Sequence, residues 1–387
     1  MDKKDVVVIG GGTGTHTVLM GLKHYQDKLN LSAVVTMADS GGSTGRLRDE
    51  FGYLPVGDVR MALTALASDV DSHEELLRKL FLYRFDKGGG LAGHNFGNLL
   101  LVALTDILGS EEEAIKSASR ILRVQGSVVP VTTTKVSLVA TYDDGVIVKG
   151  EHLIDEPSAD RGGHSIAKLS LYPEATISKS AESTILNADL VVLGPGDLYT
   201  SVLANCVVGG VSEAINNSGA KVVYICNLMT RVGQTSGMGV EKHLTEIALY
   251  LGKTPDFIII NTGTFPPDLL NKYEADGEFP VEFNNPPLGC EIIADDLLAS
   301  ESIQTVKGDV LKRSLIRHDS AKLADVILQI IYNPEVLPPE IMKGDAVAER
   351  AKKFSPTEPI IFVDDRLDQC QSVKLKKSSS RVFSYGP

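Results

Sequence analysis

Short runs of β-branched and other apolar residues alternate along this chain with longer stretches whose apolar residues recur every three or four positions. The short runs lie at residues 6–9, 32–37, 189–193, 221–226, 256–261 and 291–294. The longer stretches lie at 13–28, 59–68, 73–83, 95–108, 111–123 and after residue 319. Continuous apolar runs are typical of strands buried on both faces, and the longer period is typical of amphipathic helices. The pattern predicts an α/β fold with a mainly parallel sheet covered by helices on both faces.

The period changes between residues 127 and 151. Two stretches of alternating apolar and polar residues flank Asp143, Asp144 and Gly145 there. An Asp-Gly pair between alternating runs is a signal for a tight β-hairpin turn. We therefore expect a small antiparallel β excursion around residues 127–151.

The composition changes again near residue 333. Five prolines follow, at positions 334, 338, 339, 356 and 359, and the chain ends in a basic, serine-rich stretch. We expect one domain over residues 1–333 and an extension over 334–387 that is partly docked or flexible.

Charge and cysteine content exclude several classes of protein. The net charge of −12 argues against a protein that binds nucleic acid or anionic membranes through its overall field. The four cysteines show neither a CxxC pair nor zinc spacing, and no apolar stretch has the length of a membrane span or a signal-peptide core. We expect a cytoplasmic protein with reduced cysteines.

The first glycine cluster follows the first predicted strand and begins the first predicted helix. It comprises Gly10, Gly11, Gly12, Thr13 and Gly14. Backbone without Cβ atoms can approach a phosphate closely, and N–H groups at a helix start attract negative charge. The dinucleotide pattern GxGxxG fails at position 15, and no Gly-Lys-Ser/Thr follows. A phosphate loop and a tight turn without ligand both remain open.

The second cluster follows the second predicted strand. Asp39 could accept a hydrogen bond from a ribose, hold a divalent cation or cap a helix. Arginine suits phosphate geometrically, although Arg46 could also be solvated at a helix start. The candidate residues of this cluster are Asp39, Gly41, Gly42, Ser43 and Arg46.

Two further polar turns precede amphipathic helices. Asp58 is placed to cap a helix, or to join Asp39 in holding a cation. His94 and Asn98 would share one face at a helix start, and Asn95 could cap that helix. We count His94, Asn95 and Asn98 as candidate ligand contacts.

The fifth glycine cluster repeats the design of the first, with a buried strand, a glycine turn and then hydroxyl-bearing residues. Asn227 follows the next strand, and Arg317 lies just before the last long helical pattern. If the strands are parallel, all these loops open at the same sheet edge, where ligands bind in α/β folds. The candidates in the fifth cluster are Gly194, Gly196, Asp197, Tyr199, Thr200 and Ser201.

These loops, in this order, resemble the gluconeogenesis factor family (YvcK-type), within the superfamily of the 2-phospho-L-lactate transferase of coenzyme F420 synthesis. The resemblance covers about residues 5–332. It implies a Rossmann-like three-layer α/β/α fold and a site for a nucleotide sugar of the UDP-N-acetylglucosamine type. It also implies a role in carbon metabolism, in the supply of cell-envelope precursors and in the regulation of cell shape. It implies that Gly12, Thr13 and Gly14 cradle a diphosphate, which Asp39 flanks, and that Arg317 contacts the ligand. The chain departs from the common family pattern at Ser40 and at Arg231.

Two hypotheses about function remain. The first is a regulatory binder of a nucleotide sugar. The second is a transferase of a phosphorus-containing group, in which Asp39 and Asp58 hold Mg²⁺ and act as the candidate catalytic residues. No nucleophile or general-base pattern separates the two, and we favour the first. We also expect a homo-oligomer, in the form of a dimer.

Overall fold

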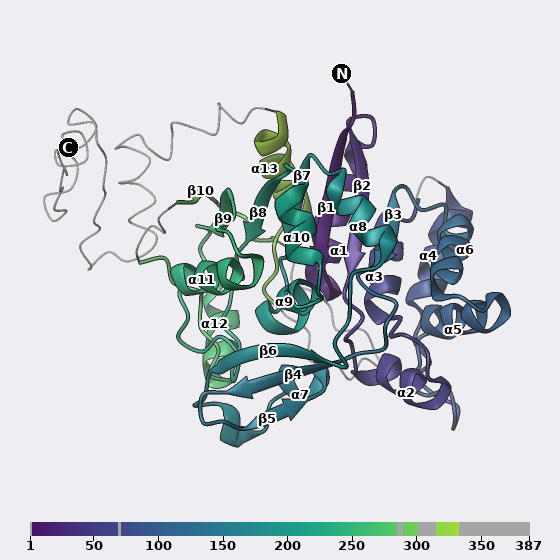
Figure 1. Ribbon diagram of the computed structural model, residues 1–387, viewed down its shortest axis with the longest axis horizontal. Coiled ribbons are helices and arrows are strands. Elements are labelled where there is room, and N and C mark those ends of the chain that lie inside the picture. Colours follow the sequence, from purple (N-terminus) through teal and green to yellow (C-terminus); the bar gives the residue numbers. More distant parts are fainter. Residues whose placement is uncertain (1, 69–70, 285–288, 301–314, 333–387) are drawn as a thin grey trace, which may run out of the picture.

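The protein is described here by a computed structural model that covers residues 2–68, 71–284, 289–300 and 315–332. Within these residues a seven-stranded sheet forms the centre of the molecule, in the order β10-β9-β8-β7-β1-β2-β3 (Figure 1). Every neighbouring pair is parallel. The strands are β1 (Lys4–Gly10), β2 (Leu29–Val35), β3 (Ser127–Pro130), β7 (Leu190–Leu193), β8 (Lys221–Ile225), β9 (Phe257–Asn261) and β10 (Glu291–Asp295).

Helices cover both faces of this sheet, so the predicted α/β architecture is confirmed. On one face α1 (Gly12–Leu22) packs against α3 (Gly57–Leu66) and α13 (Ser320–Tyr332), and on the other α10 (Val211–Asn217) packs against α8 (Lys179–Leu186) and α11 (Val240–Leu251). The remaining helices are α2 (Gly42–Phe51), α4 (Ser72–Leu82), α5 (Phe96–Leu108), α6 (Glu111–Ile121), α7 (Glu151–Asp155), α9 (Leu203–Cys206) and α12 (Pro267–Ala275), with the short turns η1 (Lys23–Tyr25), η2 (Ala159–Arg161) and η3 (Leu198–Val202).

The central strands are apolar because both of their faces are covered. Val6, Val8 and Ile9 of β1 have no exposed surface, and the same holds for Val191, Val192 and Leu193 of β7. Burial of apolar surface stabilises a fold by about 25 cal/mol per Å². The sheet therefore forms the middle of one continuous apolar core, to which helices of both layers contribute.

A second, three-stranded antiparallel sheet has the order β5-β4-β6. Its strands are β4 (Ser137–Tyr142), β5 (Ile147–Lys149) and β6 (Ile166–Tyr172). The predicted turn is present, because the N–H of Gly145 donates to the Tyr142 carbonyl at 3.0 Å and Gly145 has φ +84°. Figure 1 shows this small sheet beyond the end of the main sheet toward which β1 runs from the N-terminus.

The expected extent of the antiparallel excursion, residues 127–151, is wrong at its start. Residues 127–130 form β3, which pairs in parallel with β2 at the edge of the main sheet. The last residue of β3 is Pro130. An edge strand tolerates proline because its outer side needs no backbone N–H for pairing with a neighbouring strand. The strand that completes the small sheet, β6, was not predicted from the sequence.

The strand order reverses between β1 and β7. From β1 the chain moves outward to β2 and β3, and it returns to the other side of β1 as β7 before continuing to β8, β9 and β10. In open α/β sheets ligands bind at such a reversal, outside the carboxyl ends of the strands. None of the helices in the described part of the chain is both long and apolar enough to cross a bilayer.

Candidate functional site

The glycine bends that follow β1 and β7 lie in direct contact. A Cβ atom added to Gly14 would lie only 1.9 Å from the carbonyl oxygen of Pro195. Asn205 donates from Nδ2 to the Gly10 carbonyl at 3.2 Å, and Asn227 donates from Nδ2 to the Gly196 carbonyl at 2.7 Å. Two bends that are about 180 residues apart in the chain thus form one rim.

A cleft with a volume of about 110 Å³ opens at this rim. Six of the residues singled out from the sequence line it: Thr13, Gly14, Gly196, Asp197, Asn227 and Arg317. The other lining residues are Thr17, Pro195, Leu228, Met229, Thr230, Arg231, Tyr273, Glu278, Ile316 and His318. The cleft therefore combines backbone of two glycine bends with side chains from four later segments, including the guanidinium groups of Arg231 and Arg317.

Asp58 lies beneath the first glycine bend. Its Oδ1 accepts a hydrogen bond from the N–H of Gly12 at 2.8 Å, and a Cβ on Gly11 would lie 2.4 Å from its Oδ2. The interpretation of Asp58 as a helix cap is wrong, because α3 begins at Gly57 and Asp58 lies within its first turn. One N–H of the glycine bend is consequently satisfied by protein, and it is not available to a phosphate.

Asp39 lies beside Asp58. Its Oδ1 accepts from the N–H of Gly41 at 2.9 Å, and a Cβ on Gly57 would lie 2.3 Å from its Oδ2. Burial raises the pKa of Asp39, while burial and the charge of Asp39 raise the pKa of Asp58 to about 7. Loss of hydration disfavours a carboxylate more than a carboxylic acid, and two carboxylates close together add repulsion.

A third carboxyl group joins this pair, and no motif around it pointed to this position. Glu151, the first residue of α7, accepts at Oε2 from the N–H of Ser40 at 3.1 Å, while Ser40 Oγ accepts from the N–H of His152 at 2.9 Å. Burial and then the charge of Asp39 raise the pKa of Glu151. More than 100 residues separate Glu151 from Asp39, so only the folded chain shows that they are neighbours.

The polar residues at the start of α5 bind to one another and to α2. Ser43 Oγ lies 3.2 Å from Nδ1 of His94 and accepts from the N–H of Asn95 at 3.3 Å. Asn95 caps α5 as predicted, because its Oδ1 accepts from the N–H of Asn98 at 3.2 Å. Asn98 accepts at Oδ1 from Nε of Arg60 at 2.8 Å. All four predicted residues of this network, Ser43, His94, Asn95 and Asn98, are buried and stay outside the cleft lining.

The remaining candidates have other surroundings. Arg46 is exposed and donates from both terminal nitrogens to the Ala92 carbonyl at 3.2 Å. Tyr199 and Thr200 are buried in η3. Gly41 precedes α2, and Gly42 is the exposed first residue of that helix. In the bend after β7, Gly194 has φ +75° and Ser201 lies next to Gly196. These residues shape the loops around the cleft without lining it.

Sequence reasoning missed Arg231, Glu278 and His318 as parts of the cleft wall. Arg231 lies four residues after the candidate Asn227, and His318 directly follows the candidate Arg317, so their proximity to these residues is a usable signal. Glu278 follows α12, and no motif surrounds it.

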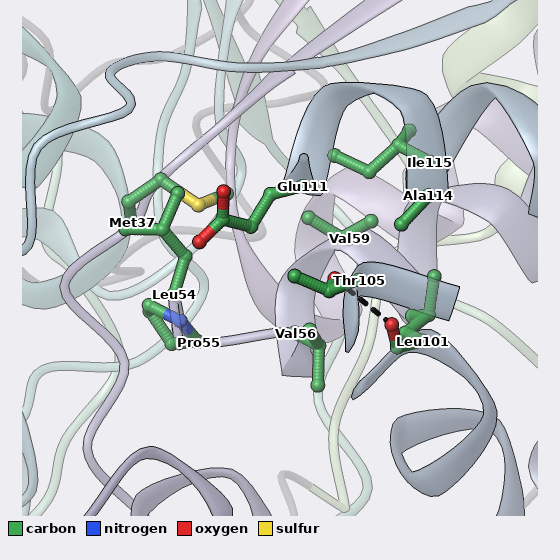
Figure 2. Close-up of a pocket in the computed structure, with 10 residues that line it drawn as sticks. All are labelled: Met37, Leu54, Pro55, Val56, Val59, Leu101, Thr105, Glu111, Ala114 and Ile115. Carbon is green, nitrogen blue, oxygen red and sulfur yellow. Dashed lines mark hydrogen bonds between the residues drawn. The ribbon is translucent and has the colours of Figure 1, made fainter. Parts of the chain in front are cut away.

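A smaller cavity lies apart from the cleft and is not a ligand site. It has a volume of about 10 Å³ and is bounded by α3, α5, α6 and the segment before α3 (Figure 2). Figure 2 shows apolar side chains on most sides, with the Glu111 carboxylate at one side and Thr105 Oγ1 donating to the Leu101 carbonyl at 3.0 Å. This volume corresponds to about one water molecule, too little for an organic ligand.

Comparison with known proteins identifies the family. The family model described as 2-phospho-L-lactate transferase CofD matches residues 6–298. The chain belongs to the CofD family. Within it, the gluconeogenesis factor of Bacillus subtilis is 39% identical over 335 residues, covering 85% of this chain and 98% of that protein. The gluconeogenesis factor of Halalkalibacterium halodurans is 40% identical over 334 residues, covering 85% and 97%.

A solved structure confirms the likeness in three dimensions. The crystal structure of a Bacillus halodurans protein of the UPF0052 family has a TM-score of 0.74 and 37% sequence identity, and the match covers 85% of this chain and 99% of that one. This CofD-family chain therefore shares its fold with that protein over nearly the whole length of the latter. The resemblance stated from the loop motifs is confirmed.

Proposed function

We propose that this CofD-family protein binds a nucleotide sugar of the UDP-N-acetylglucosamine type and acts as a factor in central carbon metabolism and cell-envelope precursor supply. The contact between the Gly14 and Pro195 bends is the observation that supports this most strongly. Two glycine bends at one strand-order reversal offer backbone to an extended, phosphate-bearing ligand. The names of its relatives agree with a role in carbon metabolism.

In this proposal the charged groups of the ligand lie near Thr13 and Arg317. Thr13 belongs to the first turn of α1, where the helix dipole favours negative charge. Arg317 lines the same cleft, and a guanidinium can bind phosphate oxygens in bidentate fashion. These groups provide local positive potential in a chain whose net charge is −12.

Calorimetry with UDP-N-acetylglucosamine tests the proposal. Arg317→Gln should weaken binding about tenfold or more, because a hydrogen bond to a charged group is worth about 1.5–3 kcal/mol. Arg120→Gln removes the same charge from an exposed position on α6 and serves as the matched control. Absence of binding to the unaltered protein, or equal effects of the two variants, would show that the proposal is wrong.

The paired carboxyl groups support a second candidate, a Mg²⁺-dependent transferase of a phosphorus-containing group. Asp58 presents an oxygen atom beneath the glycine bend and Asp39 lies beside it, and carboxylate oxygens are the ligands that Mg²⁺ prefers. A bound Mg²⁺ would neutralise charge on a diphosphate. Binding that is unaffected by chelation of Mg²⁺ and by Asp39→Asn would remove this candidate.

A further inference from the structure

One part of the cleft wall comes from segments outside the glycine bends. Arg231 follows the turn after β8, Glu278 follows α12, and His318 precedes α13. We call these three residues the polar wall. Glu278 and His318 are 5% and 8% exposed, so each belongs to the wall of the cleft and not to the outer surface.

Carboxyl oxygens, which accept hydrogen bonds, surround Arg231 of the polar wall. Arg231 Nη1 lies 3.2 Å from Glu278 Oε1, and its Nη2 lies 3.3 Å from Asp155 Oδ2. Asp197, which also lines the cleft, lies close enough to Asp155 and Glu278 for their charges to raise its pKa, after burial as the main cause, to about 7. Three carboxyl groups thus surround one guanidinium. Such surroundings repel phosphate and favour a neutral group with several hydrogen-bond donors.

Two buried nitrogen atoms of this wall have no hydrogen-bond partner among the residues that the structure describes. They are Nε2 of His318 and Nε of Arg231. Burial lowers the pKa of His318 to about 4, so its imidazole is neutral at pH 7 and can donate or accept. Buried polar atoms in native proteins are normally satisfied. Both nitrogen atoms are closed to solvent in this structure, so a ligand hydroxyl would reach them after a small rotation of the two side chains toward the cleft.

Apolar side chains line the cleft together with these polar groups. Tyr273 and Ile316 belong, with Leu228, to one small apolar cluster, and all three line the cleft. A sugar ring has the matching chemistry, with apolar C–H faces and hydroxyl groups around its edge. A uracil ring offers one N–H donor and two carbonyl acceptors, and therefore suits an acceptor-rich wall less well.

We propose that the polar wall of Arg231, Glu278 and His318 binds the sugar ring of the ligand through its hydroxyl groups. This inference rests on the proposed binding of a nucleotide sugar. It divides the cleft by chemistry: the diphosphate lies near Thr13 and Arg317, and the sugar lies against the polar wall.

The test measures the affinities of both UDP-N-acetylglucosamine and UDP by calorimetry. Glu278→Gln should weaken binding of the sugar nucleotide about tenfold and leave UDP within about twofold, because only the sugar contacts this group. Glu274→Gln, an exposed carboxyl group four residues earlier, is the matched control and should change neither affinity.

A second variant guards against misfolding. In His318→Leu an apolar side chain takes the place of the buried imidazole. Because the Nε2 atom of that imidazole has no hydrogen-bond partner among the described residues, the melting temperature should not fall. We expect this variant to weaken binding of UDP-N-acetylglucosamine about fivefold and leave UDP unchanged. A purely structural role of His318 would change the melting temperature or both affinities together.

The outcomes separate the two proposals. Suppose that the unaltered protein binds UDP and the sugar nucleotide, but that each variant weakens binding of both ligands equally or changes neither affinity. The sugar position is then wrong, while the proposed function stands. If it binds neither ligand, the proposed function fails, and the sugar position fails with it.

Discussion

At the scale of single residues, the environment of a carboxyl group decides its role. Asp58 and the exposed Asp49 have the same side chain, yet Asp58 accepts from the N–H of Gly12 and lies close to Asp39, while the Asp49 carboxyl is 76% exposed. Burial next to a second carboxyl group raises the pKa of Asp58 to about 7, above its ordinary value of 3.8. The protein therefore contains an acid that changes charge near neutral pH.

This pKa has a consequence for stability. The native state binds the Asp58 proton more tightly than the unfolded state does. Ionisation of Asp58 therefore lowers the free energy of unfolding progressively as the pH rises from 3.8 toward 7, and the whole decrease is present above pH 7. We expect Asp58→Asn to raise the free energy of unfolding more at pH 8.5 than at pH 6, by on the order of 1 kcal/mol. Asparagine can still accept from the N–H of Gly12.

Urea denaturation at both pH values measures this difference. Asp49→Asn removes the same charge from the surface and is the control. An equal effect of Asp58→Asn at pH 6 and pH 8.5 would contradict the raised pKa.

At the scale of elements, close backbone approach fixes how α1 meets the bend after β7. Gly14, in the first turn of α1, has the Pro195 carbonyl where a Cβ would lie, whereas Gly163 has no neighbouring atom within 4 Å of that position. Glycine at position 14 is thus required by packing between two segments. Its neighbour Gly12 has φ +61°, a conformation that glycine adopts without strain.

We expect Gly14→Ala to lower the free energy of unfolding by about 2 kcal/mol or more, as overpacking in a core does. Gly163→Ala should be neutral or slightly stabilising, because alanine restricts the unfolded chain. Denaturant unfolding of the two variants provides the measurement. Equal stabilities would mean that the two bends are not in contact. The clash also makes Gly14 a poor position for testing ligand binding.

The elements themselves were largely predictable from local pattern. The helix expected at 95–108 begins at Phe96 with Asn95 as its cap, and the strand expected at 256–261 is β9. The helix expected at 13–28 ends earlier, at Leu22, and continues as η1. Local periodicity and capping chemistry act over a few residues, so they can be read from the sequence.

At the scale of the whole molecule, the strand order brings the candidate site together. The order β7-β1-β2 places the bends after these strands at one edge, as the repeated strand-and-glycine design predicted. The predicted dimer and the predicted cytoplasmic location stay predictions. The division at residue 333 also stays a prediction, and residues 334–387 lie outside the described residues.

We propose that residues 1–333 fold without the extension. The matches to the gluconeogenesis factors already cover 97–98% of those proteins with 85% of this chain. The last helix of the described core, α13, buries Leu323 and Ile327 against that core, and the hydroxyl of Tyr332 at its end donates to the Lys28 carbonyl at 2.7 Å. A chain that ends at Asn333 should melt within about 3 °C of the full chain, a shift that corresponds to roughly 2 kcal/mol for a chain of this length. A fall of more than 10 °C would show that the extension contributes to the fold.

The sequence by itself determined the α/β class, most strands and helices, the hairpin turn and the loops that meet at the cleft. These features depend on period, capping and turn chemistry, which are local. Tertiary structure alone decided that β3 joins the main sheet, that Glu151 approaches Asp39, and that Glu278 faces the same cleft as Thr13. Each of these pairs residues about 95 to 265 positions apart, and such contacts follow from the packing of whole layers, which no local pattern records.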